Sequence, residues 1–242
     1  MEDIIDHCDI LMPLLNTLVS GAGASDTARL RREHAVLRVR RLGMVDYRAT
    51  WRAMQEFTSA RDEATSDEIW LAQHPAVFTL GSAARAQHMP RADLRIPIIK
   101  SDRGGQITFH GPGHILLYVL LDLQRRALSV RGLVELMESA VIDLLAEFDI
   151  CGRGNRAAPG VYVDGAKIAA LGLRVKRGCC YHGLALNVDV TLMPFGFIDP
   201  CGYPGLSVTR TRDLGVRASH EVLEGKLLDY FLARLDQQPM SR

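Results

Sequence analysis

From residue 160 to residue 190 the hydrophobic pattern has a period of two, and no other stretch constrains the fold as strongly. Apolar runs at 161–163, 166–175 and 179–190 are separated by Asp164-Gly165 and by a second short polar segment. A period of two is typical of strands, and an Asp-Gly pair between two such runs favours a tight hairpin turn. The stretch therefore predicts a three-stranded meander.

Three other segments have apolar residues every three or four positions, the spacing that predicts amphipathic helices. They are 44–57, 129–150 and 219–235. Ser219 is the expected N-cap of the last helix, whose predicted core face consists of Val222, Leu223, Leu227, Tyr230, Phe231 and Leu235.

Short apolar runs predict further strands at 35–39, 68–71, 76–80, 96–99 and 115–121. Strands and helices together predict one α+β domain. We expect this domain to occupy residues 34–242. Residues 1–33, which contain a run of glycines and other small residues, are expected to form a poorly ordered or loosely docked extension.

Composition excludes several classes of function. Apolar residues make up 48% and charged residues 24% of the chain, and the formal net charge is +1. Such a charge argues against a nucleic-acid binder that relies on a global basic field. No apolar run reaches the roughly 18 residues that span a bilayer, and the residues before the short run at 10–19 are acidic, unlike a signal peptide. We expect a cytoplasmic protein that binds neither nucleic acid nor membrane.

The five cysteines are odd in number and form no CxxC pair, so neither a disulfide framework nor a zinc site is predicted. Cys179 and Cys180 lie in a predicted strand, and at least one should point inward. Cys201 lies instead in a loop rich in glycine and proline, where a thiol is more accessible. It is a candidate nucleophile if a nearby cation favours its thiolate.

Lys167 is the one charge in an otherwise apolar or small-residue run, residues 166–172. Two interpretations remain open from the pattern. Either Lys167 faces solvent from a half-exposed strand, or its apolar neighbours desolvate it and it serves as a general base. Because 34 positions separate it from Cys201, only the fold can bring the two together.

Residues 102–114 contain four glycines, one proline, two histidines and an arginine. Arg103 offers a planar cation suited to phosphate or carboxylate. Gln106, Thr108 and His110 alternate along a short extended segment and so face one side of it. With an apolar strand predicted on either side, we interpret this segment as the floor of a pocket.

Four segments taken together resemble the lipoyl(octanoyl) transferases, also called octanoyl-acyl carrier protein:protein N-octanoyltransferases. They are Arg103-Gly-Gly-Gln-Ile-Thr-Phe-His-Gly-Pro-Gly113, Gly165-Ala-Lys-Ile-Ala-Ala-Leu-Gly172, His182-Gly-Leu-Ala-Leu-Asn187 and Asp199-Pro-Cys-Gly202. The match runs in order from about residue 42 to residue 208. It implies the fold of the catalytic domains of lipoate and biotin protein ligases, a mixed, mainly antiparallel sheet flanked by helices.

The resemblance further implies a ping-pong acyl transfer that uses no cofactor and no metal. The octanoyl group would pass from acyl carrier protein to the thiol of Cys201, and then to a lysine of an apo-lipoyl domain, with Lys167 as acid/base. The implied acceptors are the lipoyl domains of 2-oxoacid dehydrogenase complexes and the glycine cleavage H protein. Substrate contacts are implied at His74, Arg103, Gly104, Gly105, Gln106, Ile107, Thr108, Phe109, His110, Ala170, Leu171, Gly172, Gly183, Leu184 and Ala185.

Two departures from the family pattern and two alternatives stand beside this interpretation. His114 replaces the usual Gln, and Leu80 replaces the Gln of a Tyr-Thr-Gln-Gly segment. One alternative is a lipoate–protein ligase, which activates a free acid with ATP and has no use for the Cys201 thiol. The other is a non-catalytic binder of acyl groups or lipoyl domains, against which the retention of both Lys167 and Cys201 argues.

Overall fold

The computed structural model, which describes residues 37–85, 88–199, 203 and 205–238, confirms the predicted meander. Its strands β8 (Gly160–Val163), β9 (Ala166–Lys176) and β10 (Cys179–Asn187) pair antiparallel in chain order. Asp164 and Gly165 form the first turn with φ of 48° and 81°, as the tight turn requires. The extension predicted at residues 1–33 lies outside the described residues.

The meander forms one side of a seven-stranded sheet, in the order β1-β2-β6-β10-β9-β8-β7. Among the described strands of this sheet, β1 and β2 pair in parallel and all other neighbours pair antiparallel. The implied mixed, mainly antiparallel sheet is therefore confirmed. The remaining bounds are β1 (Leu37–Met44), β2 (Asp67–Gln73), β6 (His114–Leu120) and β7 (Arg153–Gly154).

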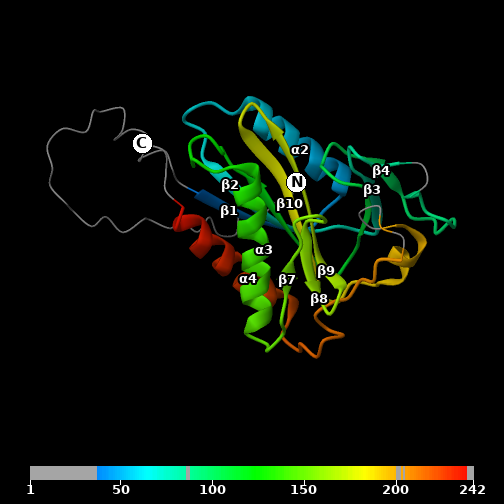
Figure 1. Cartoon of the computed structure of the whole chain (residues 1–242). Helices are drawn as coiled ribbons and strands as arrows, with labels where there is room; N and C mark the ends of the chain where they lie inside the picture. The colour runs from blue at the N-terminus through cyan, green and yellow to red at the C-terminus, as the bar shows by residue number, and fades with distance from the viewer. Residues whose placement is uncertain (1–36, 86–87, 200–202, 204, 239–242) are drawn as a thin grey trace, which may run out of the picture.

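Helices cover both faces of this sheet (Figure 1). Helices α3 (Val130–Ala146) and α4 (His220–Asp236) pack together on one face, and α2 (Tyr47–Ala60) packs on the other. The alternation along β6 shows the two faces directly, because Ile115, Leu117 and Val119 belong to the α3/α4 core while Leu116 and Tyr118 belong to the α2 core.

Two helix predictions need correction at the N-terminal end. The first helix begins at Tyr47 rather than Met44, because the Asp46 carboxylate caps it and Met44 ends β1. In α4 the cap is Ser219, as predicted, but Val222 is 47% exposed. It lies about 180° around the helix from the middle of the buried face, which is formed by Leu223, Leu227, Leu228, Phe231 and Leu235.

A smaller sheet of three strands, in the order β4-β3-β5, contains residues 107–110 of the glycine-rich segment (Figure 1). Its strands are β3 (Val77–Leu80), β4 (Ile98–Lys100) and β5 (Ile107–His110). Phe78, Ile107 and Phe109 form its own small core with Phe195 and Ile198, which come from around the 3-10 helix η2 (Met193–Phe197). Within the described residues, no helix is both long and apolar enough to cross a membrane.

Candidate functional site

Lys167 is buried near the start of β9, with 3% of its surface exposed. Its Nζ donates a hydrogen bond to the carbonyl oxygen of Pro159 at 3.0 Å and lies 5.2 Å from the centre of the Tyr162 ring. Of the two interpretations left open by the sequence, the buried lysine is the one observed. A buried amine beside an aromatic face and a carbonyl is suited to holding and moving a proton.

The main chain of Lys167 is joined to the segment that follows Cys201. Its N–H donates to the carbonyl of Ser207 at 2.8 Å, and its carbonyl accepts from the N–H of Thr209 at 2.9 Å. Val208 thereby forms an isolated parallel bridge with Lys167. The sequence did not predict this pairing, because the strand-like alternation in this segment covers only residues 206–209.

Cys201 itself lies outside the described residues, so its pairing with Lys167 stays a prediction. The residue two positions before it is anchored. Asp199 is 4% exposed, and its carboxylate accepts from Nη1 of Arg91 at 2.8 Å and lies 3.1 Å from Nδ1 of His88. These contacts hold the pKa of Asp199 below its usual range, with the His88 contact making the largest contribution. A buried carboxylate bound by a guanidinium and an imidazole fixes the start of the loop.

Three of the segments implied in substrate contact lie side by side. Residues 170–172 of β9 pair directly with residues 183–185 of β10. Gly104 lies against them, with its N–H donating to the carbonyl of Leu173 at 2.9 Å. A Cβ on Gly172 would lie 3.1 Å from the Gly104 carbonyl oxygen, so the absence of a side chain allows this close approach.

Arg103 is buried and bonds to neighbouring parts of the protein, while its predicted contact with substrate stays a prediction. Its guanidinium binds the Thr79 hydroxyl and two backbone carbonyls. Nε donates to Oγ1 of Thr79 at 3.0 Å, Nη2 to the Thr79 carbonyl at 2.6 Å, and Nη1 to the Gly104 carbonyl at 2.9 Å. Arg103 therefore joins β3 to the glycine-rich segment.

The residue before it, Asp102, binds four side chains. It accepts from Nε1 of Trp51 at 2.7 Å and from Nε2 of Gln55 at 3.0 Å, pairs with Nε2 of His182 at 2.9 Å, and accepts from the Tyr181 hydroxyl. Burial alone would raise the pKa of Asp102, but these hydrogen bonds hold it well below its usual range. A fixed carboxylate thus joins α2, β10 and the glycine-rich segment, a role that sequence reasoning missed.

The predicted pocket histidines lie together with two tyrosines. His74 and His110 have ring centres 6.2 Å apart, and Tyr47 stacks on His110 at 5.7 Å. His74 bonds to the Val45 carbonyl through Nδ1 and to the Tyr118 hydroxyl through Nε2, each at 2.6 Å.

Burial lowers the pKa of His74, and burial lowers that of His110 well below its usual value. The neutral rings are therefore favoured at pH 7. The two ring nitrogens of His110 differ. Nε2 lies 3.2 Å from the Thr79 hydroxyl, whereas Nδ1 has no hydrogen-bond partner in the described part of the chain. Tyr47 and Tyr118 carried no pattern that would have marked them, since both occupy apolar positions in their elements.

The other residues implied in substrate contact fall into a buried group and a partly exposed group. Ile107 and Phe109 are buried in the core of the small sheet, and Leu184 is buried in the α3/α4 core. Their side chains serve packing, so any ligand contact from them would come from backbone. Gly105, Gln106 and Thr108 are at least partly exposed.

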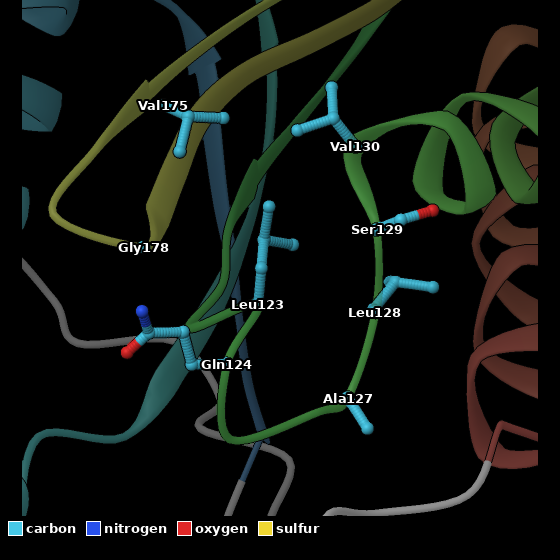
Figure 2. Close-up of a pocket in the computed structure, with 8 residues that line it drawn as sticks. All are labelled: Leu123, Gln124, Ala127, Leu128, Ser129, Val130, Val175 and Gly178. Carbon is cyan, nitrogen blue, oxygen red and sulfur yellow. The ribbon is translucent and has the colours of Figure 1, made fainter.

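A cavity of about 810 Å³ lies beside Lys167. Tyr162, whose ring faces the Lys167 amine, forms part of its wall, and Tyr203, close to Cys201 in sequence, forms another part. Cys151 and Arg153 also line this cavity. A second pocket, of about 440 Å³, is shown in Figure 2 between the β9–β10 turn and residues 123–130. It lies at the far end of β9, about 26 Å along the strand from Lys167, and is not part of this site.

Comparison with known proteins gives a consistent family. Residues 46–232 match the model of the lipoyl protein ligase A/B catalytic domain. An octanoyltransferase of Azoarcus sp. (strain BH72) is 58% identical over 199 residues, which cover 82% of this chain and 88% of that protein. An octanoyltransferase of Aromatoleum aromaticum is 60% identical over 178 residues, covering 74% of this chain and 77% of that protein.

Solved structures agree on the fold. A lipoate-protein ligase A with bound ATP has a TM-score of 0.69 at 15% sequence identity, covering 82% of this chain and 85% of that one. A putative lipoate protein ligase from T. acidophilum with bound lipoic acid has a TM-score of 0.67 at 16% identity, with the same coverage. At such identities the likeness shows the fold alone.

Proposed function

The chain belongs to the lipoyl protein ligase A/B catalytic-domain family, and we propose that it works through a covalent octanoyl thioester on Cys201. It is an acyltransferase that transfers octanoyl groups in lipoate biosynthesis. The observation that carries the proposed mechanism is the buried amine of Lys167, whose main chain bonds to the segment following Cys201.

In the first half-reaction the donor is octanoyl-acyl carrier protein. The Cys201 thiolate attacks the thioester carbonyl, and a new C–S bond forms as the bond to the phosphopantetheine sulfur breaks. Lys167 takes the Cys201 proton and returns it to the released phosphopantetheine thiol. One thioester replaces another, so the step is nearly isoergic and needs no nucleotide.

In the second half-reaction the acceptor is a lysine of an apo-lipoyl domain. Its amine attacks the Cys201 thioester, so that a C–N bond forms and the C–S bond breaks. A lysine amine is mostly protonated at pH 7 and therefore needs a base. Lys167 accepts one of the two protons that the ammonium group loses and passes it to the departing Cys201 sulfur, and the other proton is released to solvent. The conversion of a thioester into an amide runs downhill.

The acyl chain and the pantetheine arm would contact the three adjoining segments 103–110, 170–172 and 183–185, with His74 at the pocket wall. Their close packing through Gly104 and Gly172 supports one continuous surface. For the acceptor, we propose lipoyl domains of 2-oxoacid dehydrogenase complexes and the glycine cleavage H protein. A bi-partite lipoate protein ligase from T. acidophilum, studied together with its E2 lipoyl domain, shares this fold at a TM-score of 0.65 and supports that class of acceptor.

Intact mass tests the mechanism. Incubation with octanoyl-acyl carrier protein, without acceptor, ATP or magnesium, should add one octanoyl group to the peptide that contains Cys201. Hydroxylamine should remove it, as expected for a thioester. Cys201→Ser should abolish both adduct and transfer.

Cys151→Ser and Cys179→Ser are the controls, because Cys151 is an exposed thiol beside the same cavity and Cys179 lies in β10. Both should retain the adduct. ATP-dependent transfer from free octanoate, with no adduct on Cys201, would contradict the proposal and favour the ligase alternative.

A further inference from the structure

Glu138 of α3 and Lys167 of β9 bind the two ends of one peptide group. Oε1 of Glu138 accepts from the N–H of Gly160 at 2.8 Å, and Nζ of Lys167 donates to the carbonyl of Pro159 at 3.0 Å. That N–H and that carbonyl belong to the single peptide bond between Pro159 and Gly160. The bond is trans, as are all peptide bonds in the described residues, so the two groups point to opposite sides. The peptide therefore stands between the carboxylate and the amine.

We propose that Glu138 is a positioning residue that fixes the Lys167 amine through this peptide. The inference rests on the proposed function, in which Lys167 carries protons for Cys201. A carboxylate bound to an amide N–H polarises that amide, so its carbonyl accepts a hydrogen bond more strongly. Glu138 thus sets both the direction of the Pro159 carbonyl and its strength as a partner for the amine.

The surrounding packing leaves this peptide little freedom. A Cβ on Gly160 would lie 2.6 Å from Cε of Lys167, so the lysine stem fills the space above the glycine. On the other side, Oε2 of Glu138 would lie 2.7 Å from a Cβ on Gly154, so β7 confines the carboxylate. The Tyr162 hydroxyl holds the same turn by donating to the carbonyl of Ala158 at 2.7 Å.

The pKa of Glu138 is raised above its usual value by its surroundings. Burial raises the pKa of Glu138, and the Gly160 N–H lowers it in part. Glu135 raises it further, while the charge of Lys167 lowers it. Lys167 therefore acts electrostatically on Glu138 although a peptide group separates them.

Two substitutions at Glu138 separate its hydrogen bond from its charge. The assay is single-turnover transfer from a preformed Cys201 thioester to an apo-lipoyl domain. Glu138→Ala should slow it on the order of tenfold to a hundredfold, because the peptide loses a charged hydrogen-bond partner. Glu138→Gln keeps an acceptor oxygen and should stay within about threefold of wild type. Glu135→Ala, which removes an exposed carboxylate of the same helix, is the matched control and should transfer like wild type.

A double-mutant cycle with Lys167→Ala distinguishes positioning from mere support of the fold. If Glu138 acts through Lys167, Glu138→Ala should cause no further slowing once the amine is absent. Full slowing in that background, or wild-type transfer by Glu138→Ala alone, would overturn the inference while leaving the proposed function intact. Wild-type transfer by Lys167→Ala would overturn the acid/base role of Lys167, and the inference with it.

Discussion

Gly160→Ala tests whether the lysine stem needs the space that glycine leaves. Gly160 has φ of +147°, where a side chain is strained by about 1–3 kcal/mol. The new Cβ would also lie 2.6 Å from both Cε of Lys167 and the carbonyl oxygen of Ala169. Overpacking of this kind costs about 1–3 kcal/mol. We expect the free energy of unfolding to fall by about 2–6 kcal/mol in total.

The β8–β9 turn supplies a matched control. Gly165 also has positive φ, +81°, but a Cβ there would meet no atom within 4 Å. Gly165→Ala should therefore lower the free energy of unfolding only through the strain of a side chain at positive φ, about 1–2 kcal/mol. Urea denaturation gives both losses, and acyl transfer is measured at a temperature where both variants stay folded.

The two variants should differ more in activity than in stability. In Gly160→Ala the lysine stem must move, which breaks the bond from Nζ to the Pro159 carbonyl. Transfer should then fall on the order of a hundredfold, towards that of an enzyme without the base, while Gly165→Ala should transfer close to wild type. Equal stability of the two variants together with wild-type transfer by Gly160→Ala would refute this reasoning.

Two further predictions concern Lys167 and His114. Lys167→Ala should slow transfer roughly 10²–10⁴-fold, the usual range for a positioned acid/base. Lys167→Arg should be equally slow, because a guanidinium keeps its proton. A wild-type rate for the Arg variant would show that Lys167 supplies only a positive charge. Burial lowers the pKa of His114 from its ordinary 6.5 to about 4. The unfolded chain therefore binds this proton first, and stability present above pH 6.5 is lost as the pH falls towards 4. The free energy of unfolding should fall by about 3 kcal/mol between pH 6.5 and pH 4 for this reason. His114→Gln, which has no imidazole to protonate, should show a smaller fall over the same pH range. An unchanged fall would show that other groups cause the loss of stability.

Much of the fold could be predicted because local patterns and long-range packing agree. The period-two stretch from 160 to 190 became three consecutive strands, since each alternation matches a sheet with two different faces. Helix ends were less predictable. Met44 continues the apolar stripe of α2 in sequence, yet the Asp46 carboxylate begins the helix after it, so a cap decided the boundary.

The candidate site was predictable only as a set of residue types. Arg103 was recognisable as a candidate, but its bonds to Thr79 depend on the pairing of β3 with β5, which no local pattern specifies. The burial of Lys167 likewise depends on Tyr162 from β8 and the turn before it. Glu138 had no signal at all, because a glutamate on a helix is ordinarily a solvated surface residue.

The main chain and the side chain of Lys167 have separate roles, and this separation makes substitution of the side chain informative. The backbone N–H and carbonyl of Lys167 hold Ser207 and Thr209, and Asp199 is held independently by Arg91 and His88. The loop that contains Cys201 is therefore anchored on both sides by contacts that do not involve the Lys167 amine. Lys167→Ala removes the amine and leaves both anchors in place, because any non-proline residue supplies the same backbone groups. A loss of transfer in that variant then tests the proposed role of the amine as a proton carrier, without displacement of the loop that contains the thiol.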